Sequence, residues 1–397
     1  VFMLSFICKI MFDWKTILKR TMIFLILSIA IILPKIKTDD EIMEESRNGA
    51  LMTLQVNKRF ENLKSSGGEK GKDYQQYYEF IHNVNLFSQS LLDNNLSDYL
   101  KYFRNAAEYG ETVYDNYPEF FGLGSTAMEV DNVPIKTAKE NVKRTFIRDY
   151  HKLDFYNSKL KELSFSDVLR SDIYEIIGEN KLFSNFFLIL FLIVVLMMDL
   201  ILSFEVKDSV WRTIPKSFVS YQIKKKLIST CLVFGVQVFV SILVFVMLLL
   251  TKTINPHIVP SIVIFSMNNE ATSVSVFYFM IPILFIVFLL DLLFIMMATI
   301  LFQITRSKIF SSSLILFVLF LERMMIHSSI YKHFPALSPI YYIDTVSALN
   351  GNKSLIYNYP FSYMDACKSI FMYICLLFIL LILIIKQQDR RCKYGNK

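Results

Sequence analysis

Six apolar blocks, separated by polar segments, constrain the fold of this chain more than any other feature of its sequence. Each block is near or above the roughly 17 to 25 residues that cross a hydrocarbon core of about 30 Å as a helix. Because a backbone within lipid must satisfy its own hydrogen bonds, each block is predicted to be helical. The blocks span residues 17–33, 182–204, 227–250, 277–302, 309–326 and 369–385. The sequence therefore predicts an all-α polytopic membrane protein with six transmembrane helices.

Lysine and arginine residues alternate between the two sides of the predicted membrane. Four segments that would share one side hold 17 of them, whereas two segments on the other side hold four. Because positively charged loops stay in the cytoplasm, we expect a multi-pass protein of the cell membrane with both termini cytoplasmic. The basic segments are residues 1–20, 205–226, 303–308 and 386–397, and the other two are residues 251–276 and 327–368. The net charge of +7 thus reflects orientation in a bilayer, and we expect no nucleic-acid partner.

One long polar insert, residues 36–180, follows the first block and is predicted to form an α-helical extracellular domain. From residue 35 to residue 181 the chain has 20 Lys and Arg against 25 Asp and Glu, unlike the basic internal segments. Apolar periodicity predicts helices at residues 39–63, 74–92, 97–109, 137–163 and 166–177, with an aromatic loop at 110–133. None of the five cysteines lies in this insert, so an apolar core must hold it together without disulfides.

The segments on either side of the insert complete a three-part organisation. Residues 1–35 are predicted to form an amphipathic helix in the membrane plane, followed by the first transmembrane helix, because Ser5, Lys9 and Asp13 share one helical stripe. A cleaved secretory signal is an alternative for this region, but the apolar run continues past its small residues, so we expect an uncleaved span. Residues 181–397 are predicted to form a five-helix transmembrane domain with a cytoplasmic coupling segment at 205–226.

The sequence carries no recognisable catalytic or metal-binding motif. A glycine- and lysine-rich stretch at residues 67–72 is one residue short of the phosphate-loop spacing and lies in the insert, where we expect a flexible turn. The cysteines and the five histidines lack the spacings of zinc sites. We therefore expect a protein that is not an enzyme and that binds no metal or cofactor itself. Any ATP-driven step would need ATP and Mg²⁺ on a separate subunit.

Besides Lys19 and Arg20 at the start of the first block, four charged residues lie within the apolar blocks, where charges are costly and often functional. Asp291 is the fifteenth residue of a 26-residue block, and it would either hydrogen-bond a neighbouring helix or line a substrate route. Asp199 lies near the inner end of its block and can reach interfacial water, which favours a structural role. Glu322 and Arg323 lie near the outer end of theirs and are expected to reach the outer interface. Asp291 and Asp199 are thus the candidates for a translocation path.

The coupling segment combines an apolar face with positive charge, as expected of a docking site for a partner protein. Asp208 can cap a helix that carries Trp211 and Ile214 before Pro215 interrupts it. Trp211 and Ile214 would be buried anchors in such a contact, while Arg212 would meet acidic groups at its rim. The residues expected to couple this chain to a partner are Glu205, Asp208, Trp211, Arg212, Ile214 and Pro215.

This coupling segment resembles that of the ABC-2 family, the membrane permeases of ABC exporters. The residues that carry the resemblance are Glu205, the stretch 209–214, Pro215, Ser217 and the lysines 224–226. A proline-aromatic run at residues 334–342 is similar to the family's motif before its last span. The Gly-Thr pair that usually follows the acidic residue, and the arginine after the proline, are absent here. The resemblance covers nearly the whole chain, although the long insert matches only the ABC-2 permeases with a large extracellular domain between the first two spans.

The resemblance implies a half-transporter that works with a cytosolic ABC ATPase subunit. Two permeases, either two copies or this chain with a paralogue, would move a peptide, lipid or amphiphilic substrate out of the cell. One alternative is a membrane sensor or immunity protein whose extracellular domain binds a peptide ligand, although an internal segment of 22 residues leaves little room for an output domain. Another is a polytopic membrane enzyme, which would need a cluster of His, Asp or Glu at one membrane face.

Overall fold

The chain is mostly helical, and two four-residue strands are the exception among the described residues. The computed structural model describes residues 39–64, 72–116, 135–169, 191–198, 201–202, 218–250, 262–265, 270–326, 338–351, 353–354 and 359–394, together with residues 19 and 22. The all-α expectation is therefore confirmed in its main part. It missed a hairpin in the segment between the third and fourth apolar blocks.

The insert folds into a helical bundle whose helices agree with those expected from its apolar periodicity. Its elements are α3 (Asp39–Lys64), α4 (Lys72–Leu92), α5 (Leu96–Asn116), α6 (Ile135–Ser158), the 3₁₀ helix η3 (Leu160–Glu162) and α7 (Phe165–Leu169). Helix α5 continues seven residues beyond the expected end at residue 109, so the expected loop begins later than position 110. The rest of that loop and residues 170–177 lie outside the described residues.

The turn between α4 and α5 shows how local sequence fixes the bundle. Asn94 adopts the left-handed conformation with φ 58°, which asparagine tolerates better than most residues. The Asn95 side chain then accepts a hydrogen bond from the Asp98 backbone nitrogen at 3.2 Å and donates one to Asp98 Oδ2 at 2.7 Å. These bonds cap the first turn of α5 and set it antiparallel to α4.

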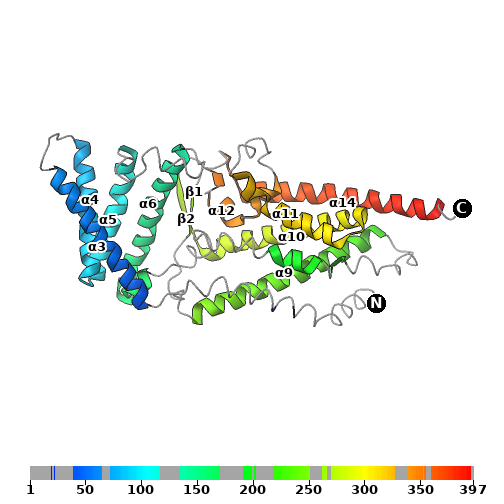
Figure 1. Cartoon of the computed structure of the whole chain (residues 1–397), viewed down its shortest axis with the longest axis horizontal. Coiled ribbons are helices and arrows are strands. Elements are labelled where there is room, and N and C mark those ends of the chain that lie inside the picture. Colours follow the sequence, from blue (N-terminus) through cyan, green and yellow to red (C-terminus); the bar gives the residue numbers. More distant parts are fainter. Residues whose placement is uncertain are drawn as a thin grey trace.

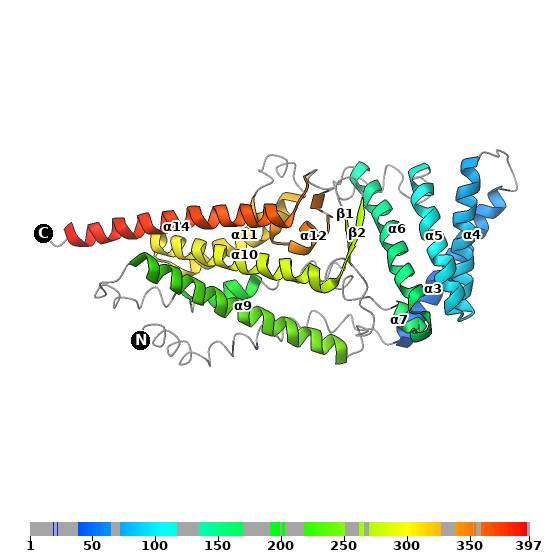
Figure 2. The ribbon, with the colours of Figure 1, turned by 180° about the vertical axis from the view of Figure 1, so that it is seen from behind.

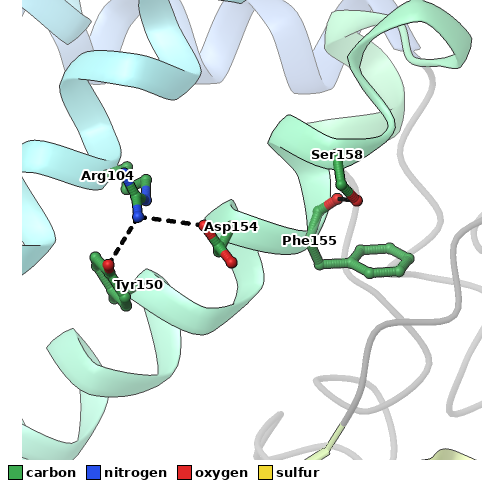
Figure 3. A network of polar contacts seen from close by, with 5 residues as sticks. All are labelled: Arg104, Tyr150, Asp154, Phe155 and Ser158. Atoms are coloured by element: carbon green, nitrogen blue, oxygen red, sulfur yellow. Dashed lines mark hydrogen bonds and ion pairs between the residues drawn. The ribbon is translucent and has the colours of Figure 1, made fainter.

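The bundle has its own apolar core, separate from that of the long helices. Leu100 of α5 and Leu153 and Tyr156 of α6 lie in one buried cluster with residues of α3, α4 and α7. On the surface, Arg104 of α5 donates to Tyr150 Oη at 2.7 Å and lies 3.3 Å from Asp154 Oδ1 (Figure 3). An exposed pair of this kind contributes little, so burial of apolar side chains is the main stabilising term.

Four long helices form the second part of the molecule. They are α9 (Phe218–Leu250), α10 (Val276–Thr305), α11 (Lys308–Ile326) and α14 (Tyr363–Tyr394). Three of them contain stretches long and apolar enough to cross a membrane, at Ile223–Leu243, Tyr278–Thr305 and Tyr363–Ile384, and α11 has a shorter apolar stretch, Lys308–Leu321. These four helices coincide with the last four predicted blocks. Residues 191–198 and 201–202 of the second block are helical, and the first block lies almost wholly outside the described residues.

The exposed surface of these helices is apolar, as expected of a protein that faces lipid. On α14, Phe371, Leu376 and Leu383 are each more than half exposed. On α11, the buried positions Ser311, Ile315 and Leu319 recur every four residues, while the intervening large apolar side chains point outward. A water-soluble helix buries its apolar face instead. The pattern indicates a membrane-embedded protein.

Short elements connect those ends of the long helices that lie toward the bundle, which we call the outer ends (Figure 1). Strands β1 (Ile262–Phe265) and β2 (Ala271–Val274) form an antiparallel hairpin between α9 and α10. The 3₁₀ helix η7 (Pro339–Tyr342) and helix α12 (Thr345–Leu349) lie between α11 and α14 and pack on α10, α11 and α14. Tyr341, Tyr342 and Phe361 form edge-to-face contacts there, with ring centroids 5.6 to 6.0 Å apart.

The two helical groups lie at opposite ends of an elongated molecule. Helices α3, α4, α5 and α6 stand across the long axis at one end, whereas α9, α10 and α14 run along it (Figure 1). The hairpin and α12 lie between the groups, and the view from behind shows the same order (Figure 2). The insert and the connections after α9 and before α14 therefore share one end, while the α10–α11 turn and the end of α14 lie at the other. This alternation matches the charge pattern of the sequence.

Candidate functional site

Only part of the expected functional set lies within the described residues. The translocation candidate Asp199 and all the coupling residues lie outside the described residues, so the docking role of the coupling residues stays a prediction. The coupling residues are Glu205, Asp208, Trp211, Arg212, Ile214 and Pro215. Asp291 is described, and it leads to a polar interface between two of the long helices.

Asp291 lies in the middle of α10 and is fully buried. Its Oδ1 accepts a hydrogen bond of 3.0 Å from Gln237 Nε2 of α9, and Gln237 is only 2% exposed. Among the two roles that the sequence left open for Asp291, a hydrogen bond to a neighbouring helix is what the structure shows. A place on a substrate route stays a prediction, since the carboxyl group has no contact with solvent in this conformation.

A second polar contact joins α9 and α10 nearer the basic end of the helices. The Lys226 side chain, 2% exposed, donates from Nζ to Thr299 Oγ1 at 2.8 Å. Thr299 Oγ1 in turn donates to the Ile295 carbonyl at 2.8 Å, and Thr230 Oγ1 donates to the Lys226 carbonyl at 2.9 Å. Lys226, the last of the three lysines at residues 224–226, therefore points between the two helices.

These contacts share one face of α9. Positions 226, 230, 233, 237 and 240 follow spacings of three and four residues, and all five side chains are buried. We call the residues Lys226, Thr230, Gln237, Asp291 and Thr299 the polar seam. Its signal was present in the sequence, because a polar stripe at helical spacing within an apolar block predicts a helix–helix contact.

The polar seam contrasts with the outward face of α9. Phe239 and Ile242 are 52% and 54% exposed, so these two apolar side chains point outward, while Lys226 and Gln237 form hydrogen bonds to α10. Hydrogen bonds between membrane helices contribute about 0.6 to 2 kcal/mol each, a modest amount because the separated helices find other partners for their polar groups. The seam therefore holds α9 against α10, and separating these helices would open a surface that water and polar solutes can wet.

A third polar contact connects the bundle to the outer ends of the long helices. Arg144 of α6 is 1% exposed, and its Nη1 donates to the Gly351 carbonyl at 2.7 Å. The guanidinium carbon lies 4.9 Å from the centroid of the Phe265 ring of β1, and that of Arg148 lies 5.6 Å from it. A planar cation over an aromatic ring is favourable, more so when water is excluded. Arg144 thus ties the insert to two connections of the membrane part.

Gly351 is the residue that this junction requires. Its φ of +88° is a conformation that favours glycine, and an added Cβ would lie 2.2 Å from the Phe265 carbonyl oxygen. The Phe265 backbone nitrogen also donates to the Asn350 carbonyl at 3.1 Å. We call Arg144, Phe265, Asn350 and Gly351 the outer junction. The sequence did not reveal it, because these residues come from three separate segments.

The described residues contain no group of three or more His, Cys, Asp or Glu side chains arranged to hold a metal ion. The polar seam and the outer junction both join helices or connections through buried hydrogen bonds. Comparison of the chain with protein-family models, with curated proteins and with solved structures finds no match.

Proposed function

We propose that this chain is the transmembrane permease subunit of an ATP-driven ABC exporter. The observation that carries the proposal is that the long helices have apolar outward faces and enclose a buried polar seam. Their connections lie alternately at a basic end and at the end that bears the large insert. A conduit needs helices that are stable in lipid and that can part along a polar interface. Residues 205–226 resemble the ABC-2 coupling segment, and from this resemblance we infer that a separate cytosolic ATPase supplies the energy.

In this proposal the insert is extracellular and the α10–α11 turn is cytoplasmic. The turn carries Arg306 and Lys308, and α14 ends in a basic stretch, which favours the cytoplasm for that end. The chain would span the membrane six times with both termini inside. It would assemble with a second permease copy or a paralogue and move a peptide, lipid or amphiphilic molecule outward. ATP and Mg²⁺ would bind on the ATPase subunit.

The coupling segment provides the experiment. Trp211→Ala removes the largest apolar side chain of the segment, and it should abolish co-purification with a tagged ATPase and ATP-dependent export while leaving membrane insertion intact. Phe239→Ala is the matched control, because it removes an aromatic side chain from the outward face of α9. Full ATPase binding and export by Trp211→Ala would reject the coupling assignment.

The outer junction favours a second candidate, a membrane sensor or immunity protein. A ligand bound to the insert could act on the long helices through Arg144, because this side chain contacts both parts. The two candidates differ in whether they need an ATPase subunit. Deletion of the ATPase gene should abolish export by a permease, whereas a sensor or immunity protein should still respond to its ligand.

A further inference from the structure

The Asp291 carboxyl group has one oxygen that the polar seam leaves unused. Oδ1 accepts from Gln237 Nε2, but Oδ2 is buried and has no hydrogen-bond partner among the described residues. The group is 0% exposed, so water does not hydrate it. A carboxylate in this position would keep a full negative charge against one neutral amide.

The charged residues on the elements packed against α10 lie toward the helix ends. Lys226 of α9 is bonded to Thr299, eight residues or about 12 Å along α10 from Asp291, and Lys224 and Lys225 lie further toward that end. Asp365 and Lys368 stand in the first turns of α14 at the outer end. By position, the other charged residues of α14 lie toward its far end, and they are Lys386, Asp389, Arg390, Arg391 and Lys393.

The other neighbours of α10 give the same result. Lys308 opens α11 at the basic end, and Glu322 and Arg323 occupy its last turns by position. The described residues 191–198 and 201–202 are all apolar, and α10 contains no other Asp, Glu, Lys or Arg. No cation on the described elements therefore stands opposite Asp291.

Burial of an uncompensated carboxylate costs far more than burial of the neutral acid, so such a group takes up a proton instead. A protonated carboxyl group also suits its partner. Its O–H can donate toward an amide carbonyl while its C=O accepts from the amide N–H, so an acid and a primary amide form two complementary hydrogen bonds.

We propose that Asp291 is a proton-binding site, in which the neutral acid pairs with Gln237 and joins α9 to α10 without net charge. The proton comes from water and returns to water when the group ionises. Loss of the proton leaves a bare carboxylate in the interface, which drives water in and the helices apart. The contact therefore holds while the proton is bound. The site does not depend on the proposed transport function.

Infrared spectroscopy of the full chain in lipid nanodiscs tests the site. With ¹³C-labelled aspartate at neutral pH, the wild type should show the carbonyl stretch of a protonated carboxylic acid. Asp291→Asn should remove that band, and Asp199→Asn, the matched control, should leave it. Gln237→Leu should shift the band to higher frequency, because the acid loses its hydrogen-bonded partner.

The opposite results are equally clear. Loss of a carboxylate stretch in Asp291→Asn, with no change in the protonated band, would overturn the proposal. A band that does not move in Gln237→Leu would show that the acid does not pair with this amide. If Asp291→Asn does not fold, the wild-type and Gln237→Leu spectra still decide the question.

Discussion

Replacement of Arg144 by methionine should release the insert from the outer ends of the long helices. The change removes a buried charged hydrogen bond, worth about 1.5 to 3 kcal/mol, and a desolvated cation–π contact worth about 1 to 2 kcal/mol. The Gly351 carbonyl keeps a second donor, the Ser354 backbone nitrogen at 3.1 Å, and methionine fills most of the vacated volume. We therefore expect a loss of about 3 kcal/mol, toward the lower end of the combined range.

Hydrogen exchange measured by mass spectrometry on the full chain in nanodiscs reports this loss. A change of about 3 kcal/mol corresponds to a roughly hundredfold larger opening constant. It should appear at the Phe265 amide, which bonds to the Asn350 carbonyl, and in α12. The α9–α10 interface should keep its protection, because its polar contacts at Asp291 and Lys226 lie in the middle and at the basic end of these helices, away from the outer junction.

Arg104→Met is the matched control for this prediction. It also removes an arginine from the bundle, but the Arg104 and Asp154 side chains are 34% and 63% exposed, so the loss should stay below about 1 kcal/mol. Equal exchange at Phe265 in the wild type and in Arg144→Met would show that the outer junction has no energetic role.

Three further changes test the outer junction and the bundle. Gly351→Ala should destabilise the outer junction by about 1 to 3 kcal/mol, because of its positive φ and the close Phe265 carbonyl, and should raise hydrogen exchange at Phe265 as Arg144→Met does. Gly49→Ala in α3, where an added Cβ meets nothing within 4 Å, should stabilise the bundle by about 0.5 to 1 kcal/mol. Burial raises the pKa of Tyr99 from 10.0 to about 12, so its contribution to stability is complete below pH 10 and is lost as the pH rises through 12. Thermal melts should show that Tyr99→Phe reduces this alkaline loss, and an identical alkaline decline in both proteins would contradict the assignment.

The bundle and the long helices were predictable because their signals are local. Apolar periodicity located α3, α4 and α6 within a few residues, and block length located α9, α10 and α14. The end of α5 was misjudged, because an aromatic loop was expected to begin at Gly110 and the helix continues to Asn116. The glycine is instead needed inside the helix, since an added Cβ would meet the Phe146 ring of α6 at 2.6 Å.

The hairpin and the outer junction were harder to predict, for two different physical reasons. The run Ile262–Phe265 is apolar and rich in β-branched residues, which is a strand signal, but it is too short to stand out beside two long apolar blocks. The Arg144 contact bridges 207 positions of the chain, so no local pattern can indicate it. For Asp291 the sequence left two alternative roles open. The structure shows the hydrogen bond to a neighbouring helix, through Gln237, and a place on a substrate route stays a prediction.

The bundle and the far end of α14 should lie on opposite sides of the membrane, and cysteine labelling measures this. In a chain with its five native cysteines replaced by serine, cysteine is introduced at Met52, which is 68% exposed in the bundle, or at Gln387, which is exposed near the end of α14. A membrane-impermeant maleimide should label Met52→Cys in intact cells and Gln387→Cys only after the membrane is opened. Labelling of both positions in intact cells, or protection of Met52→Cys there, would contradict an extracellular insert joined to helices that end in the cytoplasm.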